Sequence, residues 1–224
     1  MKLKISNQGF TLTELLVAMV ISGIVATGIY STFYSQQKSY MTQEQVAAMQ
    51  QNLRGAMHLL GRDIRMAGYN PKGLAPTGIQ TADANSIRFT MDVTDDAGTG
   101  PPDGDTSDPK EDITYALVDV DGDGDMDLAR NDVNGGGNHP VAENIDALDF
   151  VYLDKDGNPT TTLSEIRAVQ ASVLARTDRW DRGYKNTHVY YNQQGTSIFT
   201  PPAGDSFRRK LLTEEFKCRN LGLD

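Results

Sequence analysis

The chain has 224 residues, enough for one ordinary globular domain and an accessory segment. Its formal charge is -9, from 21 Lys and Arg against 30 Asp and Glu, and this acidic balance argues against a protein that coats nucleic acid through a basic surface. The one cysteine, Cys218, excludes an internal disulfide and a zinc site built from cysteines.

The first thirty residues predict a membrane segment behind a short basic leader. Residues 1–9 read MKLKISNQG, with Lys2 and Lys4 as their charged side chains, and residues 10–30 are mainly apolar, with Glu14 as their one charge. A helix that crosses a bilayer needs about 20 mainly apolar residues, and its basic flank is expected to stay in the cytoplasm. A conventional signal peptide fits poorly, because the apolar run is too long and no small-residue cleavage site follows it.

The apolar run continues into a segment with a helical period. Residues 31–67 lack proline, and apolar side chains recur there at three- or four-residue steps: Val46, Met49, Leu53, Met57, Leu60 and Ile64. The pattern predicts one helix from about residue 10 to 66, ended by Gly68 and the Asn70-Pro71 pair. At 1.5 Å per residue this helix would be on the order of 85 Å long, so half of it is expected to lie in a membrane or among partner subunits.

Residues 68–224 predict a β-rich domain. Short runs of β-forming residues, bounded by turn residues, predict strands at 86–91, 113–118, 126–131, 147–153, 166–176 and 207–220. Residues 154–158 predict a hairpin turn, and 95–112 form the longest loop. The predicted fold class is α+β: a long N-terminal helix, a membrane anchor over 10–30 and amphipathic over 31–67, packed on an antiparallel β-sheet domain.

The sequence GFTLTELLVAMVISGIV resembles the class III signal of type IV pilins and type II secretion pseudopilins. That signature is glycine, phenylalanine, three residues and then glutamate, here Gly9, Phe10 and Glu14, opening an apolar helix. Residues 62–69, 113–130 and 143–154 and the last predicted strand resemble minor pilins of the PilW type, which are related to J-type pseudopilins. Major pilins often carry a C-terminal disulfide loop, which a single cysteine does not allow.

The resemblance implies a pathway of processing and assembly. A prepilin peptidase would remove the leader 1–9 by cutting between Gly9 and Phe10, and the new amine of Phe10 would be methylated. The chain would lie in the inner membrane with a single span and its C-terminal domain outside the cytoplasm, and then join a pilus or periplasmic filament. Glu14 would pair with the N-terminal amine of a neighbouring subunit, because an unpaired carboxylate in an apolar core is costly; the alternative is a glutamate that reaches the membrane surface.

The function implied is that of a minor pilin, a non-enzymatic subunit for adhesion or motility that is assembled into the filament or primes it. Its partners would be other pilins, the prepilin peptidase and the inner membrane, and no nucleic acid or required cofactor is expected. One alternative is a pseudopilin of a type II secretion system. Another is a membrane-anchored calcium- or ligand-binding module that merely uses this leader.

The sequence DVDGDGDMD, Asp119 to Asp127, matches the first half of an EF-hand-like calcium loop. Asp119, Asp121 and Asp123 would contribute carboxylate oxygens, Asp125 its carbonyl group, and Asp127 a ninth-position ligand, directly or through water. The twelfth position, where a bidentate glutamate is expected, is Arg130, and strands rather than helices flank the loop. Calcium in a strand-joining loop and a solvated acidic turn therefore both remain open.

No catalytic site emerges from the other polar residues. His58, His139 and His188 have no metal-binding spacing, and no serine lies in a G-x-S-x-G motif. Cys218 falls at an apolar position of the last predicted strand, which predicts a buried structural thiol.

Overall fold

The computed structural model describes residues 9–222 and begins with one long helix. Helix α1 spans Leu12–Met66 and confirms the helix predicted over about 10–66. Contacts divide the chain into two units, Met1–Glu44 and Gln45–Asp224, and α1 belongs to the first through Glu44 and to the second from Gln45 onward.

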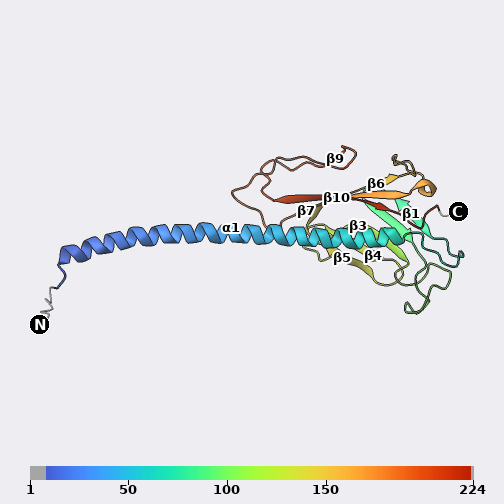
Figure 1. Ribbon diagram of the computed structural model, residues 1–224, viewed down its shortest axis with the longest axis horizontal. Coiled ribbons are helices and arrows are strands. Elements are labelled where there is room, and N and C mark those ends of the chain that lie inside the picture. Colours follow the sequence, from blue (N-terminus) through green and yellow to red (C-terminus); the bar gives the residue numbers. More distant parts are fainter. Residues whose placement is uncertain (1–8, 223–224) are drawn as a thin grey trace, which may run out of the picture. The chain divides into compact units, whose positions relative to one another are not determined.

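The second unit contains all the strands of the described chain, most of which are labelled in Figure 1. They are β1 (Gly78–Ala82), β2 (Ser86–Thr90), β3 (Asp112–Val118), β4 (Asp127–Asp132), β5 (Gly137–Ala142), β6 (Ile145–Leu153), β7 (Ala168–Arg176), β8 (Tyr190–Tyr191), β9 (Ser197–Phe199) and β10 (Arg209–Lys217), with a short 3₁₀ helix η1 (Leu163–Glu165) before β7. They form three antiparallel sheets, in the orders β1-β2-β3-β4-β5, β10-β7-β6 and β8-β9.

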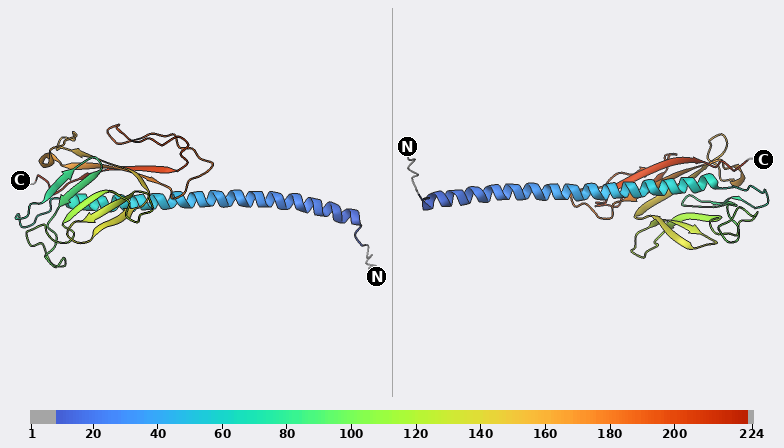
Figure 2. Two further views of the ribbon diagram at one scale, coloured as in Figure 1. Left: turned by 180° about the vertical axis from the view of Figure 1, so that it is seen from behind. Right: turned by 60° about the horizontal axis from the view of Figure 1, so that its bottom comes forward.

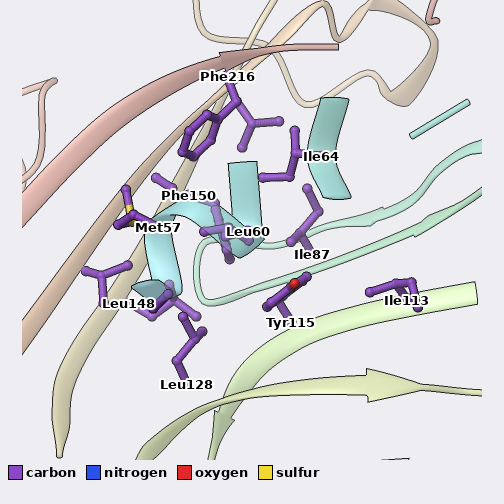
Figure 3. Close-up of a cluster of buried hydrophobic side chains, with 14 of the residues drawn as sticks. Met57, Leu60, Ile64, Ile87, Ile113, Tyr115, Leu128, Leu148, Phe150 and Phe216 are labelled. Carbon is purple, nitrogen blue, oxygen red and sulfur yellow. The ribbon is translucent and has the colours of Figure 1, made fainter. Parts of the chain in front are cut away.

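The later turns of α1 run between the two larger sheets, as both views in Figure 2 show. The predicted apolar face of the helix is buried at Met49, Leu53, Met57, Leu60 and Ile64, and Val46 is partly buried beside it. Figure 3 shows three of them, Met57, Leu60 and Ile64, between Phe150 and Phe216 of one sheet and Ile87, Tyr115 and Leu128 of the other. Because an amphipathic helix gains most of its stability from burying that stripe, this part of α1 is held by the sheets on both sides.

Helix α1 ends where glycine allows the chain to turn. Gly68 has a φ of 80°, a left-handed conformation that costs residues with a Cβ free energy, and its N–H donates to the carbonyl of Thr90 at 3.0 Å. A Cβ on Gly68 would also lie 2.4 Å from Leu221 Cδ2. The predicted stop at Gly68 is confirmed, and the glycine is required both by the turn and by the close packing.

A polar cluster inside the second unit ties α1 to the five-stranded sheet. Asp63 lies on the helix and is buried. Its Oδ2 accepts a hydrogen bond from Tyr115 Oη at 2.9 Å and forms an ion pair with Arg130 Nε at 2.7 Å. Burial of the phenol, and after it the Asp63 carboxylate, raise the pKa of Tyr115. A buried charge is tolerated only when it is paired, so these contacts fix which turn of α1 faces β3 and β4.

The six predicted strands are confirmed, as β2, β3, β4, β6, β7 and β10, whereas the sequence analysis did not predict β1, β5 or the short strands β8 and β9. Strand β5 is an edge strand that is mostly exposed and contains Pro140, which is compatible only with an edge because proline donates no ladder hydrogen bond. Strand β1 is short and has an irregularity between Ile79 and Thr81. The predicted turn at 154–158 is confirmed, with the N–H of Gly157 donating to the carbonyl of Asp154 at 3.2 Å.

Candidate processing and assembly site

The predicted cleavage site lies immediately before α1. Gly9 and Phe10 precede the helix, both are exposed, and the Phe10 side chain is 90% exposed. A peptidase needs an accessible, extended segment, and the bond between Gly9 and Phe10 lies outside the helical hydrogen bonds. The leader residues before Gly9, including Lys2 and Lys4, lie outside the described residues.

Glu14 has a local partner that the sequence analysis did not identify. Its Oε2 accepts hydrogen bonds from Thr11 N at 2.9 Å and Thr11 Oγ1 at 2.7 Å, while Glu14 N donates to Thr11 Oγ1 at 3.3 Å. This reciprocal arrangement is a capping box, which satisfies N–H groups at the start of a helix, and the spacing Thr-x-x-Glu at 11–14 was its signal in the sequence. Oε1 of Glu14 accepts no hydrogen bond from residues 9–222, so half of the carboxylate remains available to another partner.

The first unit exposes a continuous apolar surface along α1. Its large exposed side chains include Leu12, Leu15, Leu16, Val17, Met19, Val20, Ile21, Ile24, Val25 and Ile29. An 18-residue window of α1 has a mean hydropathy of 2.0 and is not buried at all, so by length and composition this helix could cross a membrane. Signal sequences share these properties, so the meaning of the segment depends on the residues that precede it.

The aspartates of the predicted calcium loop lie in the connection between β3 and β4. Ligand oxygens of Asp119, Asp121 and Asp123 lie within 4.8 Å of one another, at the surface. Their oxygens already accept backbone hydrogen bonds: Asp119 Oδ1 from Gly122 N at 2.7 Å and Oδ2 from Gly124 N at 3.1 Å, and Asp121 Oδ1 from Asp123 N at 3.2 Å. The loop joins two strands, as predicted, and its calcium ligation stays a prediction.

The other residues of that predicted site have partners of their own. The Asp125 carboxylate forms an ion pair with Arg176 of β7. Asp127 is buried, its Oδ2 accepts a hydrogen bond from Val120 N at 3.2 Å, and burial raises the pKa of Asp127. Arg130, at the twelfth position, is paired with Asp63, which explains why this position holds a base rather than a ligand.

Two further observations concern residues outside these predicted sites. Cys218 is buried, as predicted, and burial raises the pKa of its thiol to about 12, so the thiol stays protonated and unreactive at neutral pH. The structure also brings together acidic side chains of the 95–112 loop, a cluster that the sequence analysis recorded only as a long loop. The density of aspartates in that loop was the available signal.

Comparisons with known proteins agree with the N-terminal pattern and with the fold. Residues 5–30 match the family model of the prokaryotic N-terminal methylation motif. Among solved structures, the chain is similar to a type IV-like pilin from Thermus thermophilus, with a TM-score of 0.50 and 14% identity, over 77% of this chain and 97% of that chain. At this identity the likeness shows the fold alone. No curated protein sequence matches the chain.

The motif and the fold together define a class. The chain carries the class III signal of type IV prepilins at the start of an apolar helix, and that helix continues into a pilin-like domain of antiparallel sheets. The chain therefore combines a prokaryotic N-terminal methylation motif with a pilin-like fold, and the apolar part of its first helix is long enough to cross a membrane.

Proposed function

We propose that this protein is a minor pilin of a type IV pilus, cleaved between Gly9 and Phe10 and methylated on Phe10. Residues 10–30 hold it in the inner membrane, with the C-terminal domain outside the cytoplasm, until it joins the filament or primes its assembly. The observation that carries the proposal is the exposed apolar surface of α1, which begins two residues after Phe10. So much exposed apolar surface is unfavourable in water and needs a bilayer or neighbouring helices.

The composition favours a minor over a major subunit. Major pilins often close a C-terminal loop with a disulfide, and Cys218 has no second cysteine to pair with. The closing strand β10 is held by other means: its nine residues pair with β7, from Arg209 opposite Arg176 to Lys217 opposite Ala168. Phe216 and Cys218 also pack into the core.

Glu14 would contribute to assembly through the oxygen that the capping box leaves available. With Oε2 bound to Thr11, Oε1 can accept a hydrogen bond from the protonated amine of a neighbouring Phe10. In an apolar filament core such a pair offsets the desolvation of both charges, which otherwise costs several kcal/mol for each ion. This role concerns a structural subunit, and no enzymatic activity is proposed.

Mass spectrometry of the protein from its native membrane tests the processing step. The mature chain is expected to begin at a methylated Phe10, and Gly9→Val is expected to leave the full-length precursor in the membrane. Gly23→Val is the matched control, because Gly23 lies on the apolar helix with open space around it and is not at the cleavage site. A mature wild-type chain that begins at Met1, or after Tyr30, contradicts the proposal.

A type II secretion pseudopilin is the second candidate, because the class III signal and the fold suit both assemblies equally. Sheared filaments collected from the cell surface distinguish them. A minor pilin is expected in the pilus fraction, and its deletion is expected to reduce piliation. A pseudopilin is expected to remain with the cell envelope, and its deletion is expected to abolish export of secreted enzymes without loss of pili.

A further inference from the structure

The long loop between β2 and β3 gathers carboxylates around a single residue. Oxygens of Asp96, Asp103 and Asp108 lie within 4.8 Å of one another, and so do oxygens of Asp105, Asp108 and Glu111. Asp108 belongs to both triads, so four other acidic side chains surround it, and all five residues lie within the 16-residue segment 96–111. We call these five residues the Asp108 cluster.

Asp108 itself is buried and unpaired. The residue is only 4% exposed. Its Oδ2 is inaccessible to solvent and accepts no hydrogen bond in the described chain. Burial, then the charges of Asp103 and Glu111, raise the pKa of Asp108 to about 6. A carboxylate oxygen buried without a partner is strongly unfavourable, so Oδ2 of Asp108 calls for a partner that residues 9–222 do not supply.

The surrounding loop fixes the other oxygens in place. Glu111 is fully buried, and its Oε1 accepts hydrogen bonds from Val93 N at 2.7 Å and Thr94 N at 2.9 Å, while Oε2 accepts a longer one from Asp108 N at 3.3 Å. Asp105 Oδ1 accepts from Ser107 N at 2.8 Å. Each of these oxygens is held by backbone N–H groups, and a carboxylate has lone pairs left for a cation after such a bond.

Positive side chains do not neutralise the cluster. The ion pairs found between residues 9 and 222 involve other carboxylates, such as Asp63, Asp112, Asp146 and Asp205, and none involves a member of the Asp108 cluster. Lys72 reaches the loop, but its Nζ donates to the backbone carbonyl of Asp103 at 2.9 Å rather than to a carboxylate. Within residues 9–222, these five carboxylates therefore have no ion-pair partner.

The acidic loop at 119–127 does not share these properties. Asp119, Asp121 and Asp123 lie at the surface, where water screens their repulsion, and their oxygens cap nearby backbone N–H groups. None of their side-chain oxygens is both buried and unpaired. Convergence of charge occurs at both loops, but only the Asp108 cluster combines it with a buried, unsatisfied ligand atom.

We propose that the Asp108 cluster binds a calcium ion, with Asp108 as the central ligand and the other four carboxylates around it. All five candidate ligands are oxygens, which suit hard cations, and the set contains no histidine or cysteine that would favour zinc. Calcium accepts six to eight oxygens in flexible geometry, whereas magnesium demands a near-ideal octahedron at shorter distances and keeps several waters. A crowded, irregular set of carboxylates on a loop therefore suits calcium better than magnesium.

Calorimetric titration of the full chain in detergent, after treatment with a chelator, tests the proposal with calcium chloride as the probe. The wild type is expected to bind calcium and to melt at a higher temperature with it, and magnesium chloride is expected to give a smaller shift. Asp108→Asn keeps the shape of the side chain and removes its charge, so calcium affinity at this site is expected to fall at least tenfold. Without calcium, this variant is expected to melt at or above the wild-type temperature, because one repelling charge is gone.

The double variant Asp121→Asn with Asp123→Asn is the matched control at the other acidic loop, and it is expected to keep the binding that Asp108→Asn loses. Asp103→Asn with Asp105→Asn gives a second test within the Asp108 cluster, with the same expected loss. The proposal is overturned if calcium produces neither heat nor a melting shift in the wild type. It is also overturned if Asp108→Asn binds calcium as the wild type does, or if only the 121/123 variant loses binding.

Discussion

Replacing glycine by alanine is expected to change the stability of the protein in opposite directions at two positions of α1, Gly55 and Gly61. A Cβ added at Gly61 would lie 2.4 Å from Phe216 Cε1, 2.8 Å from Cδ1 and 3.0 Å from Cζ, whereas a Cβ at Gly55 would meet nothing within 4 Å. Phe216 lies on β10 and its ring is buried in the core, so the ring cannot rotate into solvent to make room. Gly61 is therefore a packing requirement, and Gly55 is not.

The magnitudes follow from two opposing terms. Alanine is favoured over glycine inside a helix by about 1 kcal/mol, so Gly55→Ala is expected to raise the free energy of unfolding by up to that amount. Gly61→Ala gains the same helix propensity but overpacks the core, at a cost of about 1–3 kcal/mol. Because the propensity term cancels in the comparison, Gly61→Ala is expected to be about 1–3 kcal/mol less stable than Gly55→Ala.

Urea unfolding of a chain shortened to begin at Gln36, without the apolar run, measures the difference as a shift in midpoint at constant slope. Phe216→Leu added to Gly61→Ala should recover part of the loss by making room for the new methyl group. Equal stabilities of the two alanine variants would refute the packing of Phe216 on Gly61 and, with it, the assigned contact between α1 and β10.

Three other outcomes are expected. The chain that begins at Gln36 should be soluble without detergent, because the exposed apolar residues of α1 lie mainly before it; aggregation of that chain would contradict the assignment of the anchor. Leu53→Asp should destabilise the shortened chain by a few kcal/mol because Leu53 is buried in the core. Gln51→Asp, on the exposed side of the helix, should have a small effect, and similar unfolding midpoints of the two variants would be inconsistent with the assigned buried face. Asp63→Ala should cost about 3–5 kcal/mol because it leaves the buried Tyr115 and the partly buried Arg130 without their partner. Arg62→Ala should cost less than about 1 kcal/mol in the same assay, because the Arg62 side chain is mostly exposed.

The parts of the fold that the sequence predicted are those encoded by local periodicity. The steps from Met49 to Ile64 identified the buried face of α1, because a helix repeats every 3.6 residues wherever it packs. Strands β3, β6 and β7 were predicted for the same reason, since their apolar residues alternate or run continuously between turns. Strand β5 escaped prediction because an exposed edge strand has no apolar side that must be buried.

The long-range features could not be predicted in this way. Asp63 and Arg130 are 67 positions apart, and their pairing depends on which turn of α1 meets β4. The Asp108 cluster depends on the path of a loop whose residues have no repeat, so its five acids looked like ordinary loop composition. The capping box at Thr11 and Glu14 is different: its four-residue signature was present in the sequence, within the motif already identified for another reason.

Glu14 thus has one observed role, in the capping box, and one proposed role, in assembly, and mutation can separate the two. Thr11→Ala removes the side chain that accepts from Glu14 N, so the start of α1 is expected to lose about 1 kcal/mol, while the carboxylate remains available to a neighbouring amine. Glu14→Gln keeps a side chain that can complete a capping box but has no charge to pair with that amine. On the proposal of a filament subunit, Thr11→Ala should therefore still enter sheared filaments, and Glu14→Gln should not.

Both variants should be cut after Gly9 normally, which mass spectrometry of the membrane fraction checks, so that a failure to assemble is not a failure to mature. If instead the two variants are lost from filaments to the same extent, the capping box rather than the charge is what assembly requires. If Glu14→Gln assembles like the wild type, pairing of Glu14 with a neighbouring amine is excluded. The distinction matters because the two carboxylate oxygens of Glu14 differ: Oε2 accepts hydrogen bonds from Thr11 of its own chain, and on the proposal Oε1 would accept one from the next subunit.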